Sequence, residues 1–197
     1  MGTKSSLSRR AMAAAWMQSV CLGLLLGGVS SCNGTDPVPQ AIIDDLPAED
    51  PGGPSATHRA GQPCLQCHST YGEALPQLVI GGTVFKEDPM TGSLLPAPHV
   101  RVEVYDSAGD FRVACSNAAG NFSIETSNWE KITFPLKSFV GNDHAGNATR
   151  RMRSIIGREG SCANCHKLSG PAHDSPGVIV VDEGEEDQGT ETCATVP

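Results

Sequence analysis

Two short stretches of the sequence combine thiol and imidazole groups at the same spacing. One reads CLQCH at residues 64–68, and the other reads CANCH at residues 162–166. On a helical turn, residues i, i+3 and i+4 lie on one face, so two sulfur atoms and one imidazole can address the same bound group. We call these stretches the first and second pentads. Their residue types and spacing predict a site for a cofactor or a metal ion.

Three kinds of chemistry use paired cysteines at this spacing. Covalent haem attachment uses two thioether bonds and an adjacent histidine that ligates the iron. A structural zinc site closes a tetrahedron with two such cysteine pairs, but it does not explain why a histidine follows each second cysteine. Thiol–disulfide exchange normally belongs to a thioredoxin-like βαβ pattern, which this sequence lacks. The pattern therefore favours haem over zinc, and zinc over redox exchange.

The pentads resemble the haem-attachment motifs of c-type cytochromes, although the chain lacks the helical body of the small monohaem class. The resemblance implies two covalent c-type haems and an electron carrier, with redox proteins as partners. A haem enzyme such as a peroxidase is disfavoured, because the sequence shows no acid–base pair that would serve an open iron. The residues implied are the thioether cysteines Cys64, Cys67, Cys162 and Cys165 and the iron-ligating histidines His68 and His166.

The motif does not fix the second axial ligand of either iron. Three side chains precede a pentad closely enough to reach back over a haem: His144, which is the first choice, and then His58 and Met152. The choice matters for function. Methionine ligation raises the reduction potential relative to two histidines, and an open position admits small ligands.

The N-terminus has the order of charged and apolar residues that is typical of export signals. Residues 1–10 carry basic residues and no acid, and residues 11–28 are apolar apart from Gln18 and Ser19. The run ends in Val29-Ser-Ser-Cys32, which resembles the lipobox of bacterial lipoproteins. The resemblance implies removal of residues 1–31 and lipidation of Cys32. The alternative is an uncleaved membrane anchor, because the run is almost long enough to span a bilayer.

Export has consequences for location and for the remaining cysteines. Asn33 is not the aspartate that commonly retains lipoproteins at the inner membrane, so we expect the outer membrane, facing the periplasm or the cell surface. Cys115 and Cys193 remain after lipid and haem are assigned, and an even remainder outside the cytoplasm predicts a disulfide. The alternative is that Cys115 is a buried thiol in a strand.

The charge balance excludes nucleic acid as a partner. The chain has 22 acidic and 14 basic residues, with a net charge of −8 at pH 7, and loss of the basic leader makes it more acidic still. Acids cluster in residues 182–187, in a segment that has almost no apolar residues after Val181. This composition favours a solvated tail over a docking site for a basic redox partner.

Between the pentads the sequence has the period of β-strands. Val100, Val102 and Val104 share one face of an alternating run, and residues 78–85 are rich in β-branched residues and glycine. Further short strands are expected at residues 111–115, 122–124 and 135–140, with turns at residues 88–92, 107–110 and 117–121. Short strands at this spacing predict a small antiparallel β-sandwich.

This region resembles the carboxypeptidase-regulatory-like, transthyretin-like family of β-sandwich modules. The matching residues are Gly81-Gly-Thr-Val84, Leu95-Pro-Ala-Pro-His-Val100 and Ala119-Gly-Asn-Phe-Ser-Ile124. The resemblance covers at most Leu78 to Val140. It implies a scaffold without catalysis, so it predicts architecture and not activity.

We therefore expect a mainly β fold, an immunoglobulin- or transthyretin-like sandwich flanked by short helical haem-binding segments. A short helix is expected at residues 148–156 and an edge strand at residues 178–181. If the ends of the sandwich are adjacent, the two pentads are neighbours in space. The divisions are a signal peptide (1–31), a flexible tether (32–62), the first haem-binding segment (63–75), the sandwich (76–140), the second haem-binding segment (141–175) and a short strand with an acidic tail (176–197).

Two functions follow as hypotheses. The first is a membrane-anchored di-haem c-type cytochrome that transfers electrons in the bacterial periplasm or at the outer membrane. The alternative is a surface-binding β-sandwich lipoprotein whose two cysteine pairs form a structural zinc site.

Overall fold

The computed structural model describes residue 41 and residues 43–46, 55–142, 147–168, 171–172, 175–182 and 193. The expected signal peptide, the expected lipidation site Cys32 and most of the expected tether and acidic tail lie outside these residues. The named elements in chain order are α3 (Cys64–Cys67), β1 (Leu78–Glu87), β2 (Leu94–Pro96), β3 (Arg101–Tyr105), β4 (Phe111–Cys115), β5 (Asn121–Glu125), the 3-10 turn η1 (Thr126–Asn128), β6 (Lys137–Val140), β7 (Arg150–Arg151), the 3-10 turn η2 (Cys162–Asn164), β8 (Pro171–Ala172), β9 (Ser175–Pro176) and β10 (Ile179–Val181).

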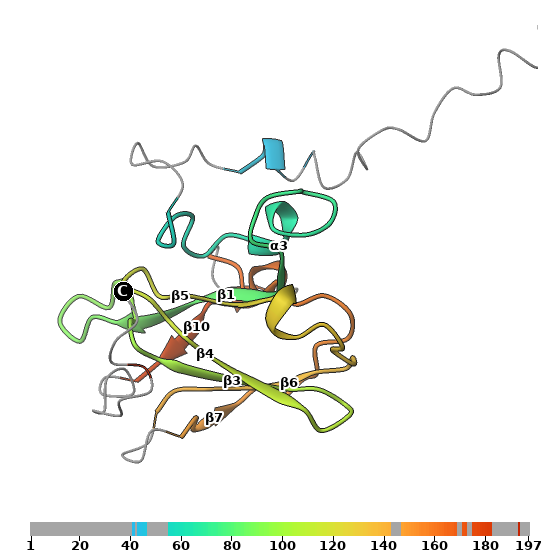
Figure 1. Cartoon of the computed structure of the whole chain (residues 1–197). Coiled ribbons are helices and arrows are strands. Elements are labelled where there is room, and N and C mark those ends of the chain that lie inside the picture. The colour runs from blue at the N-terminus through green and yellow to red at the C-terminus, as the bar shows by residue number, and fades with distance from the viewer. Residues whose placement is uncertain are drawn as a thin grey trace, which may run out of the picture. The chain divides into compact units, whose positions relative to one another are not determined.

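The described fold is mainly β, with little helix, as the strand pattern predicts. One four-stranded sheet has the order β10-β1-β2 with β5 also paired to β1, and the other has the order β4-β3-β6-β7. The short strands β8 and β9 pair separately. Figure 1 shows β1 and β5 in one layer and β3 and β6 in another, an arrangement consistent with a sandwich.

Alternating apolar residues build the core between these layers. In β3, Val102 and Val104 are almost fully buried, whereas Arg101, Glu103 and Tyr105 are only half-buried, which is the period of two expected of a strand with one covered face. One hydrophobic cluster joins residues from both sheets: Ile80, Val84, Ala97, Val100, Val102, Val104, Ala114, Phe122, Ile124, Trp129, Leu136 and Val181. Burial of this apolar surface is the main favourable contribution to folding.

Strand β1 organises the sheet that carries the pentads. It pairs antiparallel with β5 and β2, and parallel with β10, where Val84 faces Ile179 in the register. The strand expected at residues 178–181 is therefore confirmed, but the sandwich is not purely antiparallel. It also includes β7 and β10, which lie outside residues 76–140, so the second pentad lies between two strands of the sandwich.

The helix expected at residues 148–156 is wrong. Arg150 and Arg151 form strand β7, Met152 N donates to Ser138 O at 3.0 Å, and Ile156 forms a bridge with Leu136. The spacing of Met152, Ile155 and Ile156 fits a helix, but strand β6 offers an unpaired edge whose hydrogen bonds outweigh that local preference.

The end of the expected tether is fixed on the sandwich. The Asn117 side chain donates to Ala56 O at 2.6 Å, and Gly61 N donates to the Thr83 hydroxyl at 2.7 Å. Residues 55–62 are therefore part of the folded region that contains the first pentad, and not part of a free tether. Among the described residues, no helix reaches the length and apolar character that crossing a membrane requires.

Candidate cofactor-binding site

The two pentads fold into closely similar turns. His68 N donates to Cys64 O at 2.9 Å, and His166 N donates to Cys162 O at 2.8 Å. The first turn is the short helix α3, and the second begins as the 3-10 turn η2. In both turns the chain closes back from the histidine to the first cysteine, which is the i to i+4 relation that the spacing predicts.

Each pentad histidine has one ring nitrogen fixed by a backbone carbonyl. His68 Nδ1 lies 2.8 Å from Pro76 O, and His166 Nδ1 lies 2.8 Å from Gly177 O. A carbonyl oxygen can only accept, so Nδ1 must be the protonated nitrogen in both rings. In its neutral form each ring therefore carries its lone pair on Nε2. A ring held in this way is oriented and made more basic for a metal at Nε2.

The first cysteine of each pentad packs on β1. A Cβ atom added at Gly81 would lie 2.9 Å from Cys64 Cβ, and one added at Gly82 would lie 2.8 Å from Cys162 Cβ. Both distances are shorter than carbon–carbon contact allows. Adjacent glycines of one strand thus leave the space that the two cysteines occupy.

The pentads are neighbours because the second one is joined to β1 directly. Gly81 forms a parallel bridge with Ser161, and Gly81 N donates to Gly160 O at 3.1 Å. Figure 1 shows the segment after β7 running beside α3 and β1. The expected adjacency is present, but backbone pairing with β1 produces it, not a meeting of the two ends of the sandwich.

The four pentad cysteines are free thiols, and their environments differ. Burial first, and the neighbouring Cys64 second, raise the pKa of the Cys162 thiol to about 12. Burial also raises the pKa of Cys64, whereas Cys165 is exposed. Within the described ranges, which hold both pentads, no group of three or more histidine, cysteine, aspartate or glutamate side chains is placed to hold a metal ion.

The candidate distal ligands fall in three different places. His58 lies next to the first pentad, with its ring centre 5.8 Å from that of His68. Met152 lies beside β6, in the sheet that does not include β1. His144 lies outside the described residues. Spacing along the chain places His144 before His58 among the candidate distal ligands, because it does not reveal that residues 55–62 fold back onto β1 and β5.

The two remaining cysteines form a disulfide. Cys115 in β4 is bonded to Cys193 over a sequence separation of 78 residues, with the Cα atoms 5.4 Å apart. His99 Nδ1 lies 2.9 Å from Cys193 O, on the same side of the sandwich. The bond thus ties residue 193 back to the core.

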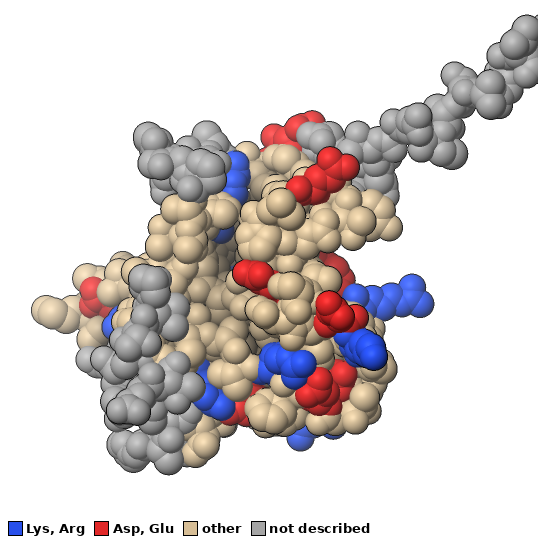
Figure 2. Space-filling model, in the orientation of Figure 1, with Lys and Arg blue, Asp and Glu red and all other residues tan. Residues whose placement is uncertain are grey.

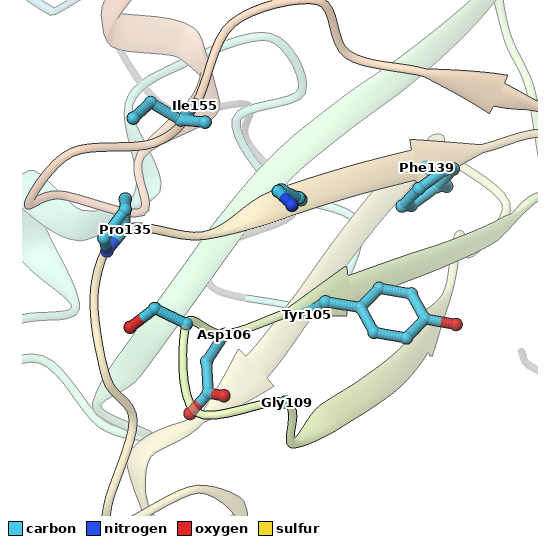
Figure 3. A pocket seen from close by; sticks show the side chains of 8 residues that line it. Tyr105, Asp106, Gly109, Pro135, Phe139 and Ile155 are labelled. Atoms are coloured by element: carbon cyan, nitrogen blue, oxygen red, sulfur yellow. The ribbon is translucent and has the colours of Figure 1, made fainter.

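A separate cavity of about 580 Å³ lies on the other sheet. Figure 3 shows Tyr105 and Asp106 on one wall, with Pro135 and Ile155 facing them. The Asp106 carboxylate accepts hydrogen bonds from the backbone of Ala108 and Asp110, both at 2.9 Å, so its function is to hold the β3–β4 turn. The full lining is Tyr105, Asp106, Ser107, Gly109, Pro135, Lys137, Phe139 and Ile155, none of which belongs to a pentad.

Charged side chains are interspersed on the visible face. Figure 2 shows acidic and basic residues side by side there, without a broad area of one sign.

The chain matches no protein-family model, no curated protein and no solved structure. The functional argument therefore depends on the residues themselves.

Proposed function

We propose that the protein is a membrane-anchored di-haem c-type cytochrome that transfers electrons outside the cytoplasm. One observation carries the proposal: both pentads form closely similar turns, and in both the histidine Nδ1 is held by a backbone carbonyl. A zinc site built from four cysteines has no use for two oriented imidazoles. Two haem sites need both of them.

The residues present fit a haem at each pentad. Cys64 and Cys67 would hold the first haem and His68 would ligate its iron, while Cys162, Cys165 and His166 would serve the second. The bound iron would supply reversible one-electron chemistry. Pro76 O and Gly177 O keep the Nδ1 protons in place and leave each Nε2 lone pair for the iron.

The sandwich contributes position. Strand β1 holds both pentads through two adjacent glycines and the Gly81–Ser161 bridge, so rigid backbone fixes the relation between the two sites. The carboxypeptidase-regulatory-like resemblance agrees with such a scaffold role. Lipidation at Cys32 and an outer-membrane location complete the proposal, and they rest on the sequence alone.

A haem assay on protein exported to the periplasm tests the proposal. We expect a sharp α band on reduction, from haem that resists acid-acetone extraction, at two haems per chain. Replacing Cys64 and Cys67 by alanine should leave one haem per chain, and so should replacing Cys162 and Cys165. The matched control, alanine at Cys115 and Cys193, removes two cysteines outside the pentads and should retain both haems.

The same variants distinguish the zinc alternative. A shared zinc site would bind one metal ion per chain and lose it completely when either pentad is changed, because each pentad supplies half of the tetrahedron. Zinc without covalent haem in the wild-type protein would contradict the cytochrome proposal and support the binding-module alternative.

A further inference from the structure

His58 lies over the first pentad although it is ten positions away from His68 in sequence. Their ring centres are 5.8 Å apart and the ring planes are inclined by 36°. His58 Nδ1 donates to Ser55 O, just as His68 Nδ1 donates to Pro76 O. Among the described residues, neither Nε2 atom has a hydrogen-bond partner. Two imidazoles thus lie close together, and neither uses its Nε2 atom in a hydrogen bond within the described part of the chain.

The separation of the rings matches a pair of axial ligands on one iron. Imidazole nitrogens bind metal ions at about 2 Å, and the ring centre lies roughly 1 Å beyond the nitrogen, so two rings on opposite sides of one ion have centres about 6 Å apart. The observed 5.8 Å is close to that span.

The sandwich holds His58 at this position. Asn121 Nδ2 donates to His58 O at 2.9 Å, and Asn121 Oδ1 accepts from Thr83 Oγ1 at 2.7 Å. The same Thr83 hydroxyl accepts a hydrogen bond from Gly61 N at 2.7 Å. Thr83 is buried in β1, and Asn121 begins β5. The loop that carries His58 is therefore fixed to the strand that also positions the first pentad.

We propose that His58 and His68 are the two axial ligands of the first haem. The inference rests on the proposed function, because it assigns the second ligand of one of its two haems. A closed bis-histidine site would exclude small ligands from that iron and would lower its reduction potential relative to histidine–methionine ligation. The first haem would then be dedicated to electron transfer.

Carbon monoxide binding to the reduced protein tests the assignment. His58→Ala should bind one more carbon monoxide per chain than the wild type and should show one high-spin haem in place of a low-spin one. Added imidazole should restore the low-spin spectrum, which a merely structural role for His58 would not produce. His99→Asn is the matched control, because His99 also has Nδ1 on a carbonyl, and asparagine tolerates the left-handed φ of 59° found there.

A second measurement tests the ligand assignment without the His58→Ala variant, in case that variant folds poorly. The variant that lacks Cys162 and Cys165 carries only the first haem and keeps His58. Its near-infrared magnetic circular dichroism should have the form given by two histidine ligands. A histidine–methionine or five-coordinate spectrum there would overturn the assignment, and so would unchanged carbon monoxide binding in a well-folded His58→Ala protein. Absence of covalent haem from the wild type would instead overturn the proposed function.

Discussion

Gly81 and Ser161 form a parallel bridge that joins the two pentads through the backbone. Gly81 lies against Cys64, and Ser161 directly precedes Cys162. A position in β1 is therefore shared by two sequence motifs that are almost a hundred residues apart. Because backbone hydrogen bonds fix this relation, the spacing of the two sites does not depend on flexible side chains.

Adding a methyl group at either glycine should disturb one pentad selectively. Gly81→Ala would place its Cβ 2.9 Å from Cys64 Cβ, and Gly82→Ala would place its Cβ 2.8 Å from Cys162 Cβ. We expect each change to lower the free energy of unfolding by about 1–3 kcal/mol through overpacking, and to reduce haem loading at the pentad it touches. Thermal melting and mass analysis of haem-bearing peptides measure the two effects.

Gly157→Ala is the matched control for these substitutions, because a Cβ there meets no atom within 4 Å and Gly157 is not among the glycines with positive φ. It should leave melting and haem loading unchanged. Equal losses at both pentads from Gly81→Ala alone would contradict the local packing argument.

Two buried serines should respond oppositely to alanine. Ser116 Oγ donates to Ala97 O at 2.6 Å and accepts from Val100 N at 2.8 Å, whereas within the described part of the chain Ser161 Oγ is buried without a partner. Ser116→Ala should cost about 1–3 kcal/mol, because a buried backbone N–H loses its acceptor. Ser161→Ala should be neutral or stabilising, because it removes an unsatisfied hydroxyl.

Chemical denaturation of both serine variants gives the comparison. A loss of stability in Ser161→Ala similar to that in Ser116→Ala would show that the Ser161 hydroxyl has a bonding partner in solution.

The Glu103 carboxylate should make stability depend on acid pH. Burial acts to raise its pKa, but hydrogen bonds from Arg101 Nε at 2.7 Å and Tyr105 Oη at 2.9 Å outweigh burial and lower the pKa overall. A carboxyl group with a lowered pKa stabilises the fold above its unfolded pKa, and this contribution disappears as the pH falls through the folded pKa. Glu103→Gln should therefore cost about 1 kcal/mol at pH 7.

The difference between Glu103→Gln and the wild type should shrink as the pH falls through the lowered folded pKa of Glu103, where the wild-type carboxyl also becomes neutral. Denaturant unfolding at several pH values measures it. Asp110→Asn is the control, because the exposed Asp110–Arg112 pair should contribute little. A difference that is the same at pH 3 and pH 7 would rule out the ionised carboxylate as its source.

The Cys115–Cys193 disulfide should stabilise the sandwich from its C-terminal end. Replacing both cysteines by serine removes a link across a sequence separation of 78 and should cost about 2–5 kcal/mol. Thiol titration of the denatured, haem-loaded protein checks the bond directly. Two additional reactive thiols that appear without reductant would show that the bond is absent.

Local patterns in the sequence predict the strands well but not the partners of the pentads. The alternation of Val100, Val102 and Val104 identifies β3, because one covered face demands a period of two. The apolar run at residues 178–181 identifies β10, but its parallel pairing with β1 depends on chain geometry that no local pattern contains. Residues 150–151 became a strand for the same reason, since the edge of β6 overrides helical spacing.

The candidate site also combines features that local sequence predicts with features that depend on residues far away in the chain. The turn of each pentad follows from its spacing, and the carbonyl partners of His68 and His166 lie 8 and 11 residues further on. The position of His58 depends on Asn121 and Thr83, whose side chains reach the loop from β5 and β1. Thr83 within β1 and Asn121 at the start of β5 were the available polar signals, but their partners become clear only once the strands are paired.

The parallel pairing of β1 with β10 also affects the order in which the protein can be assembled. Val84 meets Ile179, so the β1 edge that holds the second pentad is completed only after nearly the whole folded region has been made. Contacts between such distant parts of a chain form slowly, because a long loop must close first. Under the proposed function, a chain threaded across a membrane from its N-terminus would keep both pentads accessible during transit, and an attachment enzyme would have time to act before folding covers them.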